Sequence, residues 1–285
     1  MLNVEPFKAW EGRTARVESE VSLIQAERIS ALLDDSTLLH HGVELPNYRY
    51  AILFGDKTLQ SELADDGHAK KGDFIPPIPL PRRMFAGRRV EFLRPLHIGE
   101  KVHRVSTIKS IVAKTGRTGQ LCFVTLLHEI HGSQGIAIVE EQDVVYREAS
   151  GANADRKSEP SDKPVYIPQH DEYITKVVVP DEIMLFRYSA VTFNGHRIHF
   201  DKPYATSVEG YPGLVVNGGL IILHMWHFVA EQGYQIKRSA SKNLGSLFCG
   251  DSLVMHLARN AAGSCRLTAT NQMGHLVAEA DLEVM

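Results

Sequence analysis

The stretch "LVVNGGLIILHMWHFVAEQG", from Leu214 to Gly233, constrains the fold more than any other part of this 285-residue sequence. It has the length of a helix but is apolar almost all round, so no face of it suits water. Its longest apolar run, "GLIILHMWHFVA", has twelve residues with two histidines, which is too short and too polar to cross a bilayer. We therefore expect a helix that protein encloses on all sides.

The end of the chain predicts an antiparallel strand with one buried face. From Leu276 to Val284, small or aliphatic residues alternate with valine, glutamate and aspartate, a period of two. A second helix is expected near the N-terminus at residues 22–35, where Ser22 and Gln25 form a capping box. One face of this helix carries the apolar residues Ala26, Ile29, Leu32 and Leu33.

The same pattern of glycine turn and strand occurs in both halves of the chain. "PLHIGEKV" in the first half corresponds to "SLFCGDSL" in the second, and "HGSQGIAIVEE" corresponds to "NQMGHLVAEAD". Between the halves, "ASGANADRKSEPSDKP" is small, charged and without apolar period, as an exposed linker is. The repetition indicates a duplicated β-rich unit.

A buried helix followed by antiparallel strands is the arrangement of a hot-dog fold, in which the sheet wraps the helix. The prediction is therefore an α+β double hot-dog, with two antiparallel sheets that each wrap a central helix. Its expected parts are an N-terminal unit at 1–148, a linker at 149–165 and a C-terminal unit at 166–285.

Composition narrows the function. A net charge of −3 gives no general attraction to nucleic acid or to an anionic membrane. Three cysteines without CxxC spacing provide neither a disulfide framework nor a zinc site. The N-terminus has neither the apolar core of a signal peptide nor the Arg/Ser bias of a transit peptide. We expect a cytoplasmic protein without nucleic-acid or membrane partners.

The segment "NGHRIHFD", residues 194–201, holds two histidines, an arginine, an asparagine and an aspartate. It suits a metal site, a proton-transfer site or a polar loop. The chain has 14 histidines, most of which must be structural. Spacing alone favours that interpretation for His199 too, and "FNG" makes Asn194 an ordinary turn former. Asp201 is interpreted as a local cap or ion-pair partner.

Two long blocks resemble a known family. "RYSAVTFNGHRIHFDKPYA" followed by "GYPGLVVNGGL" is similar to the signature of the MaoC-like hydratases and dehydratases, hot-dog enzymes that act on acyl-thioesters. "PPIPLPRRMFAGRRVEFLRPLHIGE" resembles the non-catalytic half of their two-hot-dog branch. That branch includes 3-hydroxyacyl-thioester dehydratases type 2 and the hydratases of itaconyl-CoA and mesaconyl-C4-CoA. The resemblance implies a hydro-lyase without cofactor or metal, whose catalytic half is the C-terminal one.

The resemblance also implies roles for site residues. In the wider family an Asp and a His, five positions apart, hold a water; here the His position is His199, but the other is Asn194. Because an amide cannot take a proton, His199 becomes the principal acid/base and Asn194 orients the water. The Gly218 N–H is the expected donor to the thioester oxygen, at a helix start shaped by Asn217 and Gly219. The two glycines also suit tight helix packing.

Four arginines are expected to bind substrate. Arg82 and Arg83 follow the rigid "PPIPLP" run, and guanidinium groups match the phosphates of coenzyme A or a substrate carboxylate. Arg187 and Arg197 flank the signature and compete for the carboxylate. The alternative for the arginine-rich run 82–94 is a solvated strand face.

The expected function is hydration of a short branched dicarboxyl-CoA, itaconyl-CoA or mesaconyl-C4-CoA, to citramalyl-CoA. The acyl-CoA is the expected partner, and a homo-oligomer stays open. Alternatives are a 3-hydroxyacyl-thioester dehydratase of fatty-acid synthesis, a hot-dog thioesterase and a non-catalytic acyl-CoA binder. A metal-dependent oxygenase is the alternative from another class, with His199 and Asp201 as ligands and His224 or His256 as the distal one.

Overall fold

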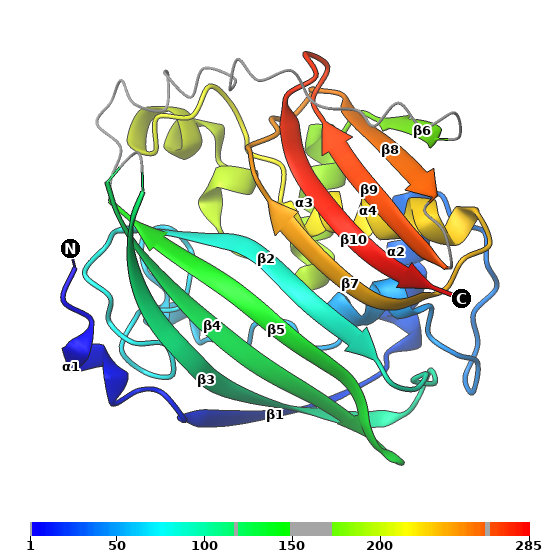
Figure 1. Cartoon of the computed structure of the whole chain (residues 1–285), viewed down its shortest axis with the longest axis horizontal. Helices are drawn as coiled ribbons and strands as arrows, with labels where there is room; N and C mark the ends of the chain where they lie inside the picture. Colours follow the sequence, from blue (N-terminus) through cyan, green and yellow to red (C-terminus); the bar gives the residue numbers. More distant parts are fainter. Residues whose placement is uncertain (1, 117–118, 149–172, 260–262) are drawn as a thin grey trace.

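The computed structural model describes residues 2–116, 119–148, 173–259 and 263–285. Within these residues, ten strands form one antiparallel sheet in the order β1-β3-β4-β5-β2-β7-β10-β9-β8-β6 (Figure 1). The strands of the first half are β1 (Thr14–Glu20), β2 (Arg82–Phe92), β3 (Lys101–Gly116), β4 (Gly119–Gly132) and β5 (Gly135–Arg147). Those of the second half are β6 (Tyr173–Val178), β7 (Ile236–Asn243), β8 (Leu253–Arg259), β9 (Ser264–Thr270) and β10 (Leu276–Val284).

The strand order makes the duplication visible. Reading inward from each edge, the sheet runs β1-β3-β4-β5-β2 on one side and β6-β8-β9-β10-β7 on the other. Gly99 and Gly250 each lie just before the second strand of this order, with φ of 92° and 87°. Gly135 and Gly274 occupy the turn before the fourth, with φ of 94° and 79°. Because these left-handed conformations favour glycine, the repeated glycines of the sequence reflect repeated turns.

Strands β2 and β7 join the halves edge to edge. Their pairing runs from Glu91 opposite Arg238 to Gly87 opposite Lys242. Beyond Gly87 the two strands part: β2 continues along β5 as Arg82–Phe85, whereas β7 ends at Asn243. The wedge between them in Figure 1 receives segments of the C-terminal half.

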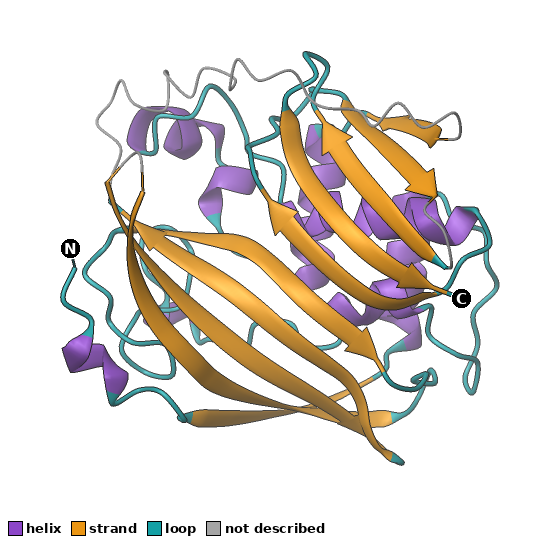
Figure 2. Cartoon of the chain, viewed as in Figure 1, coloured by secondary structure: helices purple, strands orange, loops and turns teal. Residues whose placement is uncertain are grey.

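The longer helices lie on one face of this sheet (Figures 1 and 2). They are α2 (Leu23–Leu33), α3 (Glu182–Thr192) and α4 (Gly218–Glu231). The short helical segments are α1 (Glu5–Lys8), η1 (Asn47–Ile52), η2 (Gln60–Glu62), η3 (Arg197–His199) and η4 (Tyr204–Val208). Every residue of α4 from Leu220 to Val229 is buried, so the predicted enclosure of this helix is confirmed.

The boundaries of α4 differ from the apolar stretch that predicted it. Helical structure begins at Gly218 rather than at Leu214, because Val215 is extended and bridges to Phe248. At the other expected helix, Ser22 accepts from the backbone N–H of Gln25. The four predicted apolar residues of α2 are all buried.

The core has a large and a small part. The large part contains the buried faces of both α2 and α4, so the two halves share one core. The small part lies under β3, β4 and β5, where Ile78 and Leu80 of the "PPIPLP" run pack against buried residues of these strands. Burial of this run explains how Arg82 and Arg83, which follow it, are held in place.

The predicted α+β double hot-dog is confirmed, with one addition: its two five-stranded parts are continuous through β2 and β7. The predicted linker, 149–165, lies outside the described residues, and the proposed division into domains stays a prediction. All three cysteines are free. No helix among the described residues is long and apolar enough to cross a membrane.

Candidate active site

A cavity of about 480 Å³ lies where β2 and β7 part. Both halves of the chain line it. The first half contributes the loop at Asp66–His68 and the β2 residues Arg82–Phe85 and Arg88. The second contributes residues 192–196, Ile198, His199, the start of α4 and Asn243. Of the residues predicted for the site, Arg82, Arg83, Asn194, His199, Asn217, Gly218 and Gly219 all line this cavity.

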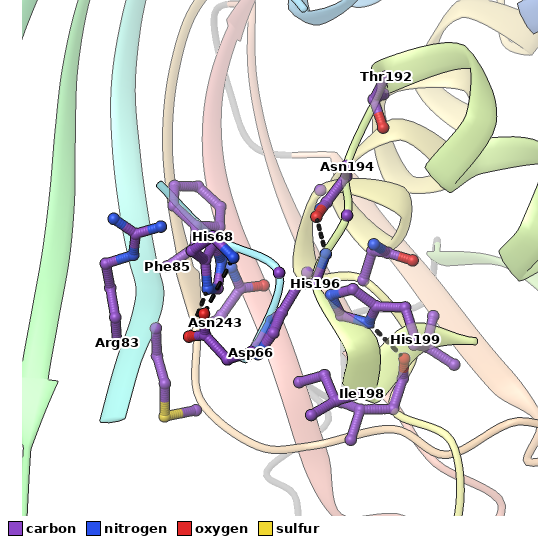
Figure 3. A pocket seen from close by; sticks show the side chains of 18 of the residues that line it. Asp66, His68, Arg83, Phe85, Thr192, Asn194, His196, Ile198, His199 and Asn243 are labelled. Carbon is purple, nitrogen blue, oxygen red and sulfur yellow. Dashed lines mark hydrogen bonds and ion pairs between the residues drawn. The ribbon is translucent and has the colours of Figure 1, made fainter. Parts of the chain in front are cut away.

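His199 is the buried imidazole of the cavity, with 7% of its surface exposed. Its Nδ1–H donates to the carbonyl of Val215 over 2.7 Å, which leaves Nε2 as the basic nitrogen (Figure 3). Burial lowers the pKa of His199 to about 4, although the bond to Val215 opposes this effect. The ring is therefore neutral at physiological pH and can accept a proton at Nε2.

Asn194 belongs to the turn that carries this histidine. Helix α3 ends at Thr192, its C-cap Phe193 has the left-handed conformation, and the Asn194 N–H then donates to the carbonyl of Ser189. The Asn194 Oδ1 accepts the N–H of His196 over 3.0 Å. This bond makes Asn194 a turn former, as the sequence allowed, and fixes its carboxamide at the cavity wall (Figure 3).

The start of α4 brings polar groups without partners to the cavity. Asn217 is 2% exposed, and neither polar atom of its side chain has a hydrogen-bond partner among the described residues. The same holds for the carboxamide of Asn243 at the end of β7. The N–H groups of Gly218 and Gly219 are among the four that a helix leaves without internal acceptors. Buried polar groups are ordinarily paired, so this cluster fits a polar ligand atom.

Close packing requires both glycines of α4. A Cβ on Gly218 would lie 2.9 Å from Asn243 Nδ2, and one on Gly219 would lie 2.4 Å from Tyr188 Oη. The packing explanation considered for these glycines is therefore supported.

The two arginines of β2 differ in their surroundings. Arg82 donates to the backbone carbonyl of Glu209 over 2.7 Å and lies 3.5 Å from the carboxylate of the same residue. Arg83 forms no ion pair with a carboxylate of the described chain, and it faces the loop of His68 (Figure 3). Arg83 is thus the cation of this wall that a ligand anion can neutralise.

Arg187 and Arg197 do not line the cavity. Arg187 is exposed on the side of α3 opposite the buried Leu185 and Tyr188. Arg197 pairs with Asp201 over 2.7 Å and donates to the carbonyl of Asp65. Neither guanidinium group therefore lies at the proposed substrate site.

Among the cavity residues that were not predicted as site residues, Asp66, His68 and His196 form a connected group. Asp66 Oδ2 lies 2.9 Å from His68 Nδ1, and the His68 ring centroid lies 4.0 Å from that of His196. The His196 ring in turn meets the His199 ring edge-on at 5.2 Å. The signal for the first two, "DGH" in a glycine-containing loop, has no periodicity that would place it near residue 196.

The predicted alternative of a metal centre at His199 and Asp201 is not supported. Asp201 accepts from Arg197 and from the backbone N–H of Tyr204. Among the described residues, the group whose ligand atoms come within 4.8 Å of one another is Asp66, His68 and His196. In that group the carboxylate and His68 already satisfy each other by a hydrogen bond.

Comparison of the chain with known proteins identifies its family. The pattern of the hydroxyacyl-thioester dehydratase type 2 family matches residues 49–249, which include every residue described above for the cavity. The chain belongs to this family. It is 47% identical over 216 residues to the mesaconyl-C4-CoA hydratase of Chloroflexus aurantiacus, 75% of each chain. It is 30% identical over 220 residues to the mitochondrial hydroxyacyl-thioester dehydratase type 2 of Schizosaccharomyces pombe, 69% of this chain and 70% of that one.

Solved structures agree in fold. A MaoC-like dehydratase from Phytophthora capsici superposes with a TM-score of 0.70 at 14% identity, over 100% of this chain and 99% of the other. A Mycobacterium tuberculosis protein described as a double hot-dog superposes at 0.57 with 12% identity, over 96% of each. Identities this low show the fold alone.

Family membership confirms the predicted resemblance and the enzyme class, a hydro-lyase of the hydratase and dehydratase type. The blocks that carried the resemblance, around "NGHRIHFD" and before "HIGE", lie within the matched residues.

Proposed function

We propose that this hydro-lyase adds water to an α,β-unsaturated CoA thioester whose short, branched acyl group ends in a carboxylate. Mesaconyl-C4-CoA and itaconyl-CoA, both giving citramalyl-CoA, are the substrates we propose. The observation that carries the proposal is one cavity in which a neutral imidazole with a free Nε2 shares the space with an unpaired helix start. The 47% identity to a hydratase named for mesaconyl-C4-CoA supports the substrate class.

His199 acts as the base toward water. As the water oxygen bonds to the β-carbon, one of its protons passes to Nε2, and the bond to Val215 stabilises the resulting imidazolium. Asn194 helps to orient this water. Its Oδ1 accepts from His196, so the amide's NH₂ group and the second lone pair of Oδ1 remain for the water.

The start of α4 stabilises the charge that gathers on the thioester oxygen. The Gly218 N–H is the donor we assign, and the helix dipole adds to it. The side chains of Asn217 and Asn243 lack partners and lie buried beside this position, so they can orient the same group. The absence of side chains at Gly218 and Gly219 lets a thioester approach the backbone.

Arg83 binds the terminal carboxylate. It is the arginine of β2 without an ionic partner in the described chain, whereas Arg82 is held by Glu209. Arg82 is then a wall of the site rather than the principal anion ligand. Recognition of a carboxylate by a guanidinium group accounts for a preference for dicarboxyl esters.

A panel of enoyl-CoA esters with and without a terminal carboxylate tests this proposal. Loss of the enoyl-thioester absorbance on the carboxylated esters, with weaker activity on crotonyl-CoA, is the expected result. Release of free thiol without loss of the double bond would instead identify a thioesterase. Binding without turnover would identify an acyl-CoA binder.

A second candidate, a dehydratase of 3-hydroxyacyl thioesters, is favoured by the family name and by the 30% identity to the S. pombe enzyme. It uses the same residues in the reverse direction. A kcat/KM on straight-chain monocarboxyl esters above that on the branched dicarboxyl esters would select this candidate.

A further inference from the structure

Hydration requires two proton transfers at different atoms: one from the water that attacks the β-carbon, and one to the α-carbon. The His199 ring is 7% exposed and tied to Val215, so its one free nitrogen has a fixed position. Asn194 cannot carry a proton between donors and acceptors. A second acid–base group in the cavity would supply the other transfer without a movement of the His199 ring.

The loop Asp66–His68 brings an acid–base pair from the N-terminal half to the same cavity. The His68 Nδ1 and Asp66 Oδ2 are 2.9 Å apart, and the backbone N–H of His68 donates to Asp66 Oδ1. Burial raises the pKa of Asp66, but the hydrogen bond and charge of His68 outweigh it and leave this pKa well lowered. A carboxylate on Nδ1 orients the imidazole and leaves Nε2 for the cavity.

Two glycines fix this loop against the loop that carries His199. A Cβ on Gly67 would lie 1.8 Å from the carbonyl oxygen of Gly195, so neither a side chain nor a gap separates the two backbones. The Arg197 N–H donates to the carbonyl of Asp66 over 2.9 Å. Figure 3 shows the result, with Asp66 and His68 on one side of the His196 ring and His199 on the other.

Other titratable groups of the cavity are poorly suited to donate a proton to the α-carbon. Burial raises the pKa of Tyr188 to about 12, so this phenol keeps its proton. Burial, with the charge of His68, holds the pKa of His196 far below its usual range, so this ring stays neutral. Glu209 is paired with Arg82, and Asp56 accepts from the backbone and hydroxyl of Thr58.

We propose that His68, oriented by Asp66, is a second catalytic residue that gives the proton to the α-carbon, while His199 takes the proton of the water. The proposal rests on the proposed hydratase function. As the water oxygen bonds to the β-carbon, one O–H bond breaks and its proton goes to His199. The π electrons shift to the α-carbon, where a C–H bond forms with the proton from Nε2 of His68. His199 then releases its excess proton to solvent and His68 takes one up from solvent, so water is the only species added.

This assignment gives the N-terminal half a catalytic residue, which the resemblance had not implied. It also separates two measurable reactions. Exchange of the α-proton of a saturated acyl-CoA needs the group near the α-carbon but no attacking water. Hydration of the unsaturated ester needs both groups.

The experiment compares wild type, His68→Gln and His199→Gln, with His40→Gln as a matched control on an exposed loop. Hydration is followed by absorbance. Exchange is followed by NMR in D₂O with the saturated methylsuccinyl-CoA analogue. We expect His68→Gln to lose both reactions, on the order of 10² to 10⁴ fold. His199→Gln should lose hydration by a similar factor but keep exchange within a few-fold.

Asp66→Asn tests the positioning residue. It should lower exchange and hydration by the same factor without changing the Kd of the saturated ester, which a merely structural role would alter. Circular dichroism checks that each variant is folded, and His68→Asn replaces His68→Gln if the latter is not.

Other outcomes overturn the assignment. The assignment is wrong if the folded His68 variant exchanges the α-proton as fast as wild type, or if His199→Gln loses exchange. It is also wrong if an active wild type shows no exchange, or if the enzyme holds a stoichiometric metal whose removal abolishes activity. A wild type that hydrates none of the esters would instead refute the proposed function itself.

Discussion

The Nδ1–H of His199 donates to the carbonyl oxygen of Val215, three residues before the first residue of α4. One bond thus links the orientation of the base to the backbone that leads into the helix start. It selects the tautomer with a basic Nε2, and it ties the base to the donors that would polarise a thioester. Five predictions follow from this and neighbouring contacts.

Replacement of His199 by Gln should lower kcat for hydration by about 10² to 10⁴ fold, because the neighbouring amide of Asn194 cannot accept the water proton in its place. Absorbance at the enoyl-thioester band measures the rate, and His40→Gln is the control. A variant with nearly unchanged kcat would exclude His199 as the base.

Asn194→Asp should fold normally, because a carboxylate can still accept the N–H of His196. Activity should persist, and its pH profile should gain an acid limb as protonation of the new carboxyl removes a second acceptor for the water proton. Asn194→Ala, which lacks the acceptor, should lower stability by about 1 kcal/mol. If Asn194→Asp has the wild-type pH profile, the side chain does not face the water.

Gly219→Ala should destabilise the fold by about 1–3 kcal/mol, because the new methyl group overlaps Tyr188 Oη. The double variant with Tyr188→Phe should recover part of this loss, since the Tyr188 Cζ lies at the more tolerable distance of 3.4 Å. Urea unfolding of the four proteins in a double-mutant cycle measures the coupling. Additive losses would mean that helix α4 moves instead.

Arg83→Met should reduce kcat/KM for carboxylated esters by about 10- to 100-fold, the scale of a lost charge-assisted hydrogen bond. Crotonyl-CoA, which has no carboxylate, should be affected far less. Arg187→Met, on the exposed face of α3, is the matched control. Equal losses on both substrates would assign Arg83 to the coenzyme or to structure.

Stability should fall as the pH is lowered from about 6.5 to about 4. Burial lowers the pKa of His199 to about 4. Burial, together with a smaller effect of the nearby charges of His227 and Lys176, lowers the pKa of His224 to about 3. The unfolded chain therefore binds more protons than the folded one between these pH values. The free energy of unfolding reaches its full value only above the ordinary histidine pKa. His224→Gln should make the slope of unfolding free energy against pH shallower by up to about 1.4 kcal/mol per pH unit. Identical slopes would show that His224 is not buried in its neutral form.

Local sequence patterns predicted the elements whose structure depends mainly on residues close together in the chain. The all-round apolar stretch predicted the enclosed α4, and the repeated glycine turns predicted the duplicated unit. Exposure of Arg187 also follows from helical periodicity, since Leu185, Tyr188 and Val191 occupy the buried side of α3. Arg197 and Asp201 are likewise a local pair, four residues apart.

Contacts between distant segments could not be predicted. His68 reaches His196 because Gly67 and Gly195 let two loops touch, and no periodicity relates these positions. Asn243 is an unremarkable residue at the end of a strand, and only the sheet brings it beside Gly218. The sequence therefore predicted the helix start that lines the cavity, but not the loop from the first half or Asn243 at the end of β7.

The parting of β2 and β7 after Gly87 has a consequence for how such a chain can vary. Side chains alternate between the faces of a strand, so a one-residue slip of β7 against β2 would turn Asn243 away from the cavity that Arg83 lines from β2. A Cβ on Gly87 would lie 2.4 Å from the carbonyl oxygen of Ser241, which makes a substitution at the last paired position costly. Insertions and deletions within this pairing should thus be selected against, whereas the outer strands of the sheet are free to drift in length.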